Sequence, residues 1–206
     1  MSIVTYNNRS IANISAIPGA AKSLIHIKTL TASSSSTLSF VNGSDDVVLD
    51  STYPIYLFKF INIHPANDDA DTLMLGSSDS GSNYNVAATS TFFQAFHPED
   101  DSSPSVGYLT TKDVAQGTSG VPIEHSVGND NDQSSSGFMY LFNPSSTTFV
   151  KHFIARFNIS HAGDNSQDIF AAGYFNTTSA IDAIQFKKDT GNIDAGTIKL
   201  YGIKDS

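Results

Sequence analysis

Short runs of alternating apolar and polar residues, separated by polar turns, dominate this sequence from residue 23 onward. Because successive side chains of a β-strand point to opposite faces, a period of two predicts a strand with one buried face. Leu24–Leu30 alternates in this way, and the turn dipeptide Asn42-Gly43 closes the strand predicted at Thr37–Val41. Further strands are predicted at Ile55–Ile63, Thr72–Leu75, Tyr84–Ala88, Thr91–Phe96, Val106–Thr110, Gly137–Phe142, Phe149–Ile159, Ile169–Asn176, Ala183–Lys187 and Thr197–Ile203.

Composition supports an all-β fold. The chain has 30 Ser, 17 Thr and 15 Asn, together 62 of its 206 residues, and only 15% of its residues are charged. Such a composition favours strands joined by polar turns over helices. The 14 Phe and 8 Tyr supply the apolar area for a core. We therefore predict a single jelly-roll-like antiparallel β-sandwich over residues 23–206.

The run Ile55–Ile63 is apolar on both faces of the predicted strand, because Tyr56, Phe58 and Phe60 share one face and mainly aliphatic residues the other. A strand of this kind is either central in a sandwich or packed against a neighbouring subunit. The second reading assigns Tyr56, Phe58 and Phe60 to a subunit interface.

Residues 1–22 differ from the rest of the chain. Their isoleucines are scattered among Asn and Ser with neither a period of two nor a helical stripe, and Pro18-Gly19 marks a turn or hinge. The segment is either a frayed terminus or an extended arm that orders against a partner, and its isoleucines favour the arm. The start, Met1 to Arg9, lacks the apolar region of a signal peptide, so synthesis in the cytoplasm is expected.

Charge and cysteine content exclude several classes of function. The chain has 11 basic and 20 acidic residues, a net charge of −9, and its only arginines are Arg9 and Arg156. Neither nucleic acid nor an anionic membrane surface is therefore an expected partner, and no apolar run is long enough for membrane insertion. Without cysteine the chain has no disulfide, no thiolate nucleophile and no zinc-finger site.

A search for catalytic and metal-binding patterns predicts no catalytic residue, no cofactor and no metal site. The six histidines have no metal-binding spacing, and no Gly-x-Ser-x-Gly motif is present. Residues 67–71 and 129–133 are rich in Asp and Asn, but neither segment continues as an EF-hand, and turn chemistry explains both. The polar stretch from Thr111 to Ser136 is predicted to be a long excursion loop at one end of the sandwich.

Several segments resemble small virion structural proteins of marine and freshwater tailed bacteriophages. They are Tyr6–Ile11, Lys28–Phe40, Tyr53–Phe60 and, most clearly, the ending Gly191–Ile203, which resembles the hairpin and final strand of phage appendage and decoration domains. The resemblance implies a jelly-roll-like module on the virion exterior, a trimer, with other virion proteins and a host cell-surface glycan as further partners. It carries no catalytic residue.

Within that resemblance, residues 1–22 become the virion anchor, formed by Ile3, Tyr6, Arg9, Ile11, Ile14 and Ile17. We expect a tail fibre or other appendage module whose sandwich loops contact the host surface. A capsid decoration protein that uses the same arm as a clasp is the alternative. A polysaccharide-degrading enzyme is less favoured, because the sequence shows no positioned pair of carboxylates.

Overall fold

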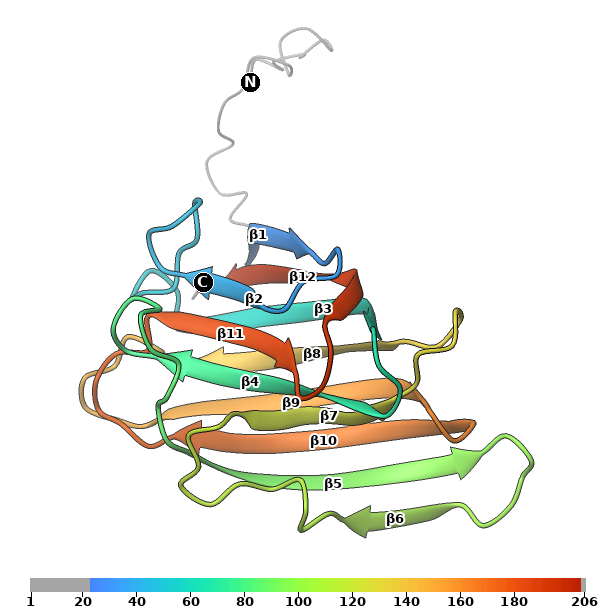
Figure 1. Ribbon diagram of the computed structural model, residues 1–206. Helices are drawn as coiled ribbons and strands as arrows, with labels where there is room; N and C mark the ends of the chain where they lie inside the picture. Colours follow the sequence, from blue (N-terminus) through green and yellow to red (C-terminus); the bar gives the residue numbers. More distant parts are fainter. Residues whose placement is uncertain (1–22, 205–206) are drawn as a thin grey trace, which may run out of the picture.

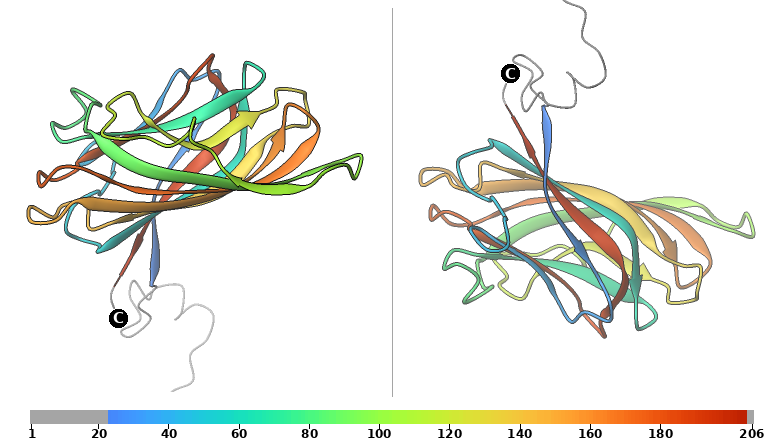
Figure 2. Two further views of the ribbon diagram at one scale, coloured as in Figure 1. Left: turned by 90° about the horizontal axis from the view of Figure 1, so that it is seen from below. Right: turned by 90° about the horizontal axis from the view of Figure 1, so that it is seen from above.

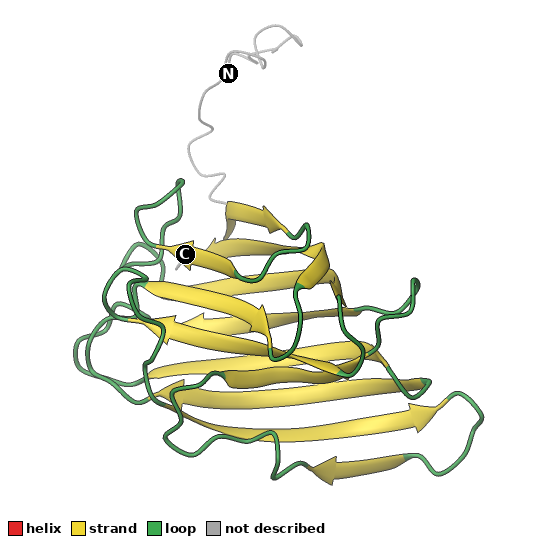
Figure 3. Cartoon of the chain, viewed as in Figure 1, coloured by secondary structure: helices red, strands yellow, loops and turns green. Residues whose placement is uncertain are grey.

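A computed structural model describes residues 23–204, and within them the chain consists of strands and loops without a helix (Figures 1 and 3). The strands are β1 (Leu24–Thr31), β2 (Leu38–Val41), β3 (Ile55–Pro65), β4 (Ala70–Ser77), β5 (Ala88–Pro98), β6 (Ser105–Tyr108), β7 (Val121–Val127), β8 (Ser135–Phe142), β9 (Lys151–His161), β10 (Asn165–Phe175), β11 (Ala183–Lys188) and β12 (Ile193–Ile203). The prediction of an all-β fold is confirmed. The predicted arm, residues 1–22, lies outside the described residues.

The strands form two antiparallel layers. The large layer has the order β1-β12-β3-β8-β9-β10-β5-β6 and the small layer the order β7-β4-β11-β2. The layers meet at one pairing, Val127 with His161, and on the opposite side a bridge joins Ser35 to Ile193. These two links make the sandwich a nearly closed barrel, which Figure 2 shows from two sides.

The chain passes from one layer to the other at most connections, as in a jelly roll; β5–β6, β8–β9 and β9–β10 are the exceptions that stay within the large layer. Both ends of the described chain lie at the β1 edge, where the backbone N–H of Lys204 donates to the carbonyl of Ser23 at 3.0 Å. The opposite edge of the large layer is β6, which among the described strands pairs only with β5.

Alternation in the sequence sets which side chains enter the core. Along β9, Lys151, Phe153, Ala155, Phe157 and Ile159 are buried, and the residues between them are exposed. Because successive side chains of a strand point to opposite faces, this strand has one core face and one outer face.

The residues predicted to form a subunit interface lie in the core, so that prediction is wrong. Tyr56 and Phe58 are fully buried and Phe60 is 2% exposed. The Phe58 ring lies 5.3 Å from that of Phe40 and 5.4 Å from that of Phe186. The Tyr56 hydroxyl donates to the carbonyl of Asp50 at 2.9 Å, and burial raises its pKa to about 12. These aromatic side chains therefore hold the two layers of one subunit together.

Two further predictions about strands are wrong. Tyr84–Val86 is irregular, and only Ala88 at the end of the predicted strand belongs to β5. The predicted excursion loop from Thr111 to Ser136 contains all of β7 and the first residues of β8. The apolar residues Val121, Ile123 and Val127 anchor β7 in the core, where Glu124 and His125 are also buried and form hydrogen bonds with other strands. No helix within residues 23–204 has the length and apolarity needed to cross a membrane.

Candidate functional site: the outer face of the large layer

Exposed aromatic side chains gather on the face of the large layer that points away from the core, here called the outer face. Residues paired across the strands form a transverse line over it: Lys199 (β12), Lys59 (β3), Phe138 (β8), Arg156 (β9), Phe170 (β10), Phe93 (β5) and Tyr108 (β6). With neighbouring strands about 4.8 Å apart, a line over these strands is roughly 30 Å long. We call the last five residues of the line the aromatic row.

Side chains within the aromatic row stack on one another. The rings of Phe93 and Phe170 lie 4.8 Å apart with an angle of 3° between their planes. The Arg156 guanidinium lies 4.6 Å from the centre of the Phe170 ring on the neighbouring strand. Both contacts are favourable beyond the burial of area, and they fix the orientation of the row. Phe93 is still 42% exposed and Tyr108 51% exposed, so the row presents apolar surface to solvent.

Arg156 is held in place by a second contact. Its Nε donates to Asp168 Oδ1 at 2.9 Å and its Nη2 to Asp168 Oδ2 at 2.6 Å, which is a bidentate pair. The pair leaves Nη1 of the guanidinium without a bond to Asp168. It also cancels the charge of Arg156 locally.

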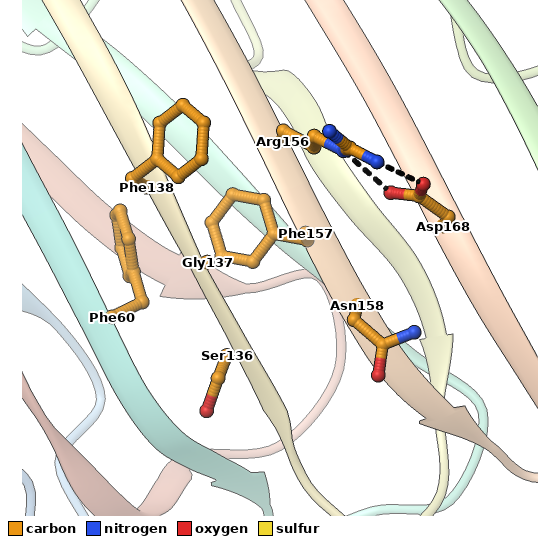
Figure 4. Close-up of a pocket in the computed structure, with 8 residues that line it drawn as sticks. All are labelled: Phe60, Ser136, Gly137, Phe138, Arg156, Phe157, Asn158 and Asp168. Atoms are coloured by element: carbon orange, nitrogen blue, oxygen red, sulfur yellow. Dashed lines mark hydrogen bonds and ion pairs between the residues drawn. The ribbon is translucent and has the colours of Figure 1, made fainter.

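A shallow hollow of about 590 Å³ opens beside the aromatic row (Figure 4). Its lining combines aromatic and polar side chains from β3, β8, β9 and β10: Phe60, Ser136, Gly137, Phe138, Arg156, Phe157, Asn158 and Asp168. Gly137 is required for this shape, because a Cβ there would lie 2.4 Å from the carbonyl oxygen of Arg156 and 2.6 Å from the Phe157 ring. The glycine thus keeps β8 close to β9.

Two lysines, here called the lysine pair, extend the line beyond the hollow. Lys59 and Lys199 stand directly opposite each other on β3 and β12, and Lys59 faces Phe138 on its other side. Within residues 23–204 neither lysine forms an ion pair, and the Lys59 ammonium lies 5.8 Å from the centre of the Tyr201 ring. Like charges directly opposite in a sheet are destabilising, so an external anion would be favoured here.

The other end of the outer face is apolar. A second hollow of about 460 Å³ lies over β5, β9 and β10, and Ile154 at its centre is 50% exposed. Across the strands it continues to Tyr140 on β8, which is paired with Ile154 and half-buried, whereas Leu57, the partner of Tyr140 on β3, is already buried. This end suits contact with an apolar partner surface.

Polar groups are also buried inside the sandwich, on β4, β7 and β11. Lys188 Nζ donates to Glu124 Oε1 at 2.9 Å, and both side chains are fully buried. The Thr72 hydroxyl donates to the same carboxylate oxygen, while Glu124 Oε2 has no hydrogen-bond partner within residues 23–204. Because solvent does not reach this ion pair, we assign it a structural role.

His125 lies next to this ion pair on β7. Its Nε2 is hydrogen-bonded to Gln94 and its ring packs against Phe92 at 5.7 Å. Burial, aided by the charge of Lys112, lowers the pKa of His125 to about 4. The neutral ring is therefore the native form at neutral pH.

The pKa of His125 predicts a loss of stability in mild acid. The unfolded chain binds a proton near pH 6.5 and the folded chain only near pH 4, so the free energy of unfolding falls as the pH drops through this window. The expected contribution is about 3 kcal/mol, lost by pH 4. Urea unfolding from pH 7 to pH 4 measures it. His125→Gln should flatten the slope in this window, and an unchanged slope would contradict the assignment.

The remaining predicted sites are the virion anchor and the two Asp- and Asn-rich segments. The anchor residues Ile3, Tyr6, Arg9, Ile11, Ile14 and Ile17 lie outside the described residues. The two Asp- and Asn-rich segments contact each other, since the Asn129 backbone N–H donates to Asp68 Oδ1 at 3.2 Å. Residues 23–204 contain no group of three side chains suited to hold a metal ion.

The sequence contained a signal for the outer face that strand prediction alone did not use. In β8 and β10, aromatic residues occupy positions that alternate with the buried ones: Phe138, Tyr140, Phe142, Phe170 and Tyr174. Aromatic residues at solvent positions of an alternating strand indicate a contact surface.

Comparisons with protein-family models, curated protein sequences and solved structures found no match to this chain.

Proposed function

We propose that this chain is a structural component of a tailed-bacteriophage virion, a tail appendage module that contacts the host surface. The observation that carries the proposal is the exposed aromatic row with its adjoining hollow. This revises the expected contact region, from the sandwich loops to the outer face. The sequence resemblance to virion proteins supports the remaining part of the proposal.

Attachment to the particle is proposed to use residues 1–22. These residues join the domain at Ser23, on the β1 edge, whereas the aromatic row extends from β8 to β6 at the opposite edge. An anchor at β1 would leave the row free for a second partner. A virion appendage needs both contacts at once.

A binding role is favoured over glycoside hydrolysis at this face. Most glycosidases place a pair of carboxyl groups on either side of the scissile bond. Among the described residues of the hollow Asp168 is the one carboxylate, and Arg156 holds it in an ion pair. We therefore propose recognition without cleavage.

The apolar end of the outer face is proposed as the contact between subunits of a trimer. As the proposed subunit interface it replaces Tyr56, Phe58 and Phe60, which lie in the core. Around a threefold axis, Ile154 and Tyr140 would pack against the same residues of the sister subunits, and burying them would remove apolar surface from water. In a closed trimer each subunit presents the same patch to the threefold axis.

Incorporation into particles tests the proposed function. Mass spectrometry of purified virions is expected to detect the intact chain. A chain without residues 1–19 should keep the circular dichroism spectrum of a strand-rich protein but be missing from the particles. Normal incorporation of the truncated chain, or the absence of the intact chain from particles, would overturn the proposal.

A further inference from the structure

We propose that the lysine pair and the hollow beside Phe138 form a binding site for an acidic glycan, a sugar chain that bears carboxylate groups. This inference rests on the proposed function, because it names the chemical class that the outer face would contact. It is supported by the charges, the aromatic surface and the free polar groups of one continuous region.

Charge on the outer face differs from that of the whole chain. The paired positions of the large layer that face outward carry three basic residues, Lys59, Lys199 and Arg156, and one acidic residue, Asp168. Three positive charges and one negative charge give a net charge of +2, on a chain whose net charge is −9. An anionic ligand would therefore be drawn to this face and repelled by the remaining surface.

The lysine pair supplies positive charge that no described carboxylate neutralises, although the Lys59 ammonium also lies 5.8 Å from the centre of the Tyr201 ring. Arg156 is paired with Asp168, but neither Lys59 nor Lys199 has a carboxylate within 4.0 Å. One carboxylate bound between the two ammonium groups would remove their mutual repulsion. In the free protein the two opposed like charges destabilise the sheet, and a bound anion would remove this destabilisation.

The hollow next to the lysine pair fits the neutral part of a sugar. Phe138 stands between Lys59 and Arg156 in the register and offers apolar surface to the C–H groups of a pyranose ring. Ser136 accepts a bond from the backbone N–H of Asn62 at 3.0 Å and keeps its hydroxyl hydrogen for a ligand. Arg156 Nη1 offers another donor, and the oxygens of Asp168 and Asn158 offer acceptors.

Charge density distinguishes an acidic glycan from a polynucleotide. A nucleic acid carries a phosphate at every nucleotide, and proteins that bind it neutralise several phosphates with Lys and Arg. The outer face offers only two uncompensated cations, side by side. This arrangement matches a chain with spaced carboxylates, with intervening uncharged rings lying over Phe138.

Isothermal titration calorimetry of the full chain tests the site, with oligogalacturonate as the acidic probe and the same oligomer with its carboxyl groups reduced as the neutral control. Oligogalacturonate should bind, and the reduced oligomer should bind at least about tenfold more weakly. The K59Q/K199Q double variant and the F138A variant should each lose about tenfold in affinity. K187Q, which removes a lysine from β11 in the small layer, should bind like the wild type.

Equal binding of the acidic and reduced oligomers would overturn the inference, as would no binding of oligogalacturonate. Tighter binding of single-stranded DNA, or an equal loss of affinity in K187Q, would do the same. The K59Q/K199Q variant should still enter virions, because its anchor is intact. Failure of glycan binding with normal incorporation therefore rejects the site and leaves the virion proposal standing, whereas absence of the wild-type chain from virions rejects the latter.

Discussion

Replacing Lys188 with methionine is expected to destabilise the fold by about 3–5 kcal/mol. The Lys188 ammonium is the only positive charge bonded to Glu124 among the described residues, and both side chains are fully buried. Without it the Glu124 carboxylate would keep only the Thr72 hydroxyl, with its second oxygen already unpartnered. A buried charge without compensation is costly because water cannot solvate it.

Urea unfolding of K188M at pH 7 measures this loss. The double variant E124L/K188M is the matched control, because it removes both charges and leaves apolar groups in their place. It should recover most of the stability lost in K188M, since well-packed apolar pairs often replace buried ion pairs without loss. A cost below about 1 kcal/mol for K188M would mean that the ion pair is solvated like a surface pair.

Phe58→Ala is expected to cost about 3–5 kcal/mol in the free energy of unfolding. Phe58 is fully buried, and its ring lies against Phe40 in the same core cluster as Phe186. The substitution removes a ring where the two layers meet and leaves a cavity that the surrounding strands cannot fill. The loss should appear as a lower midpoint of urea unfolding.

The matched variant for Phe58→Ala is Ile154→Glu, on the outer face. Ile154 is half exposed, so a charge there should leave the unfolding midpoint of the subunit nearly unchanged. Light scattering should show that it dissociates the proposed trimer. If Phe58→Ala changed the oligomeric state without loss of stability, the assignment of Phe58 to the core would be contradicted.

Alternation in the sequence predicted the fold class and most strands, because one buried face leaves a period of two in the chain. It did not predict β7, whose buried residues include Glu124 and His125. These polar residues find their partners on β4, β5 and β11, and such partners are set by the tertiary fold. The local sequence therefore predicts a loop where the tertiary fold forms β7.

The faces of β3 show a second limit of the sequence. Tyr56, Phe58 and Phe60 alternate with Ile55 and Leu57, and both sets are apolar, so hydropathy alone left two assignments of the core face. The register settles the matter, because the aromatic set points at the small layer. The aromatic row likewise depends on pairing between strands that are distant in sequence, such as β5 and β10.

The number of copies per virion, from quantitative mass spectrometry of purified particles, tests the proposed role most directly. A tail appendage occupies one end of the particle, and its subunits form closed symmetric groups. We therefore expect several trimers per virion, on the order of a few dozen copies or fewer. Several hundred copies would identify a capsid decoration protein and contradict the appendage proposal. No detectable copies would contradict a structural role in the virion altogether.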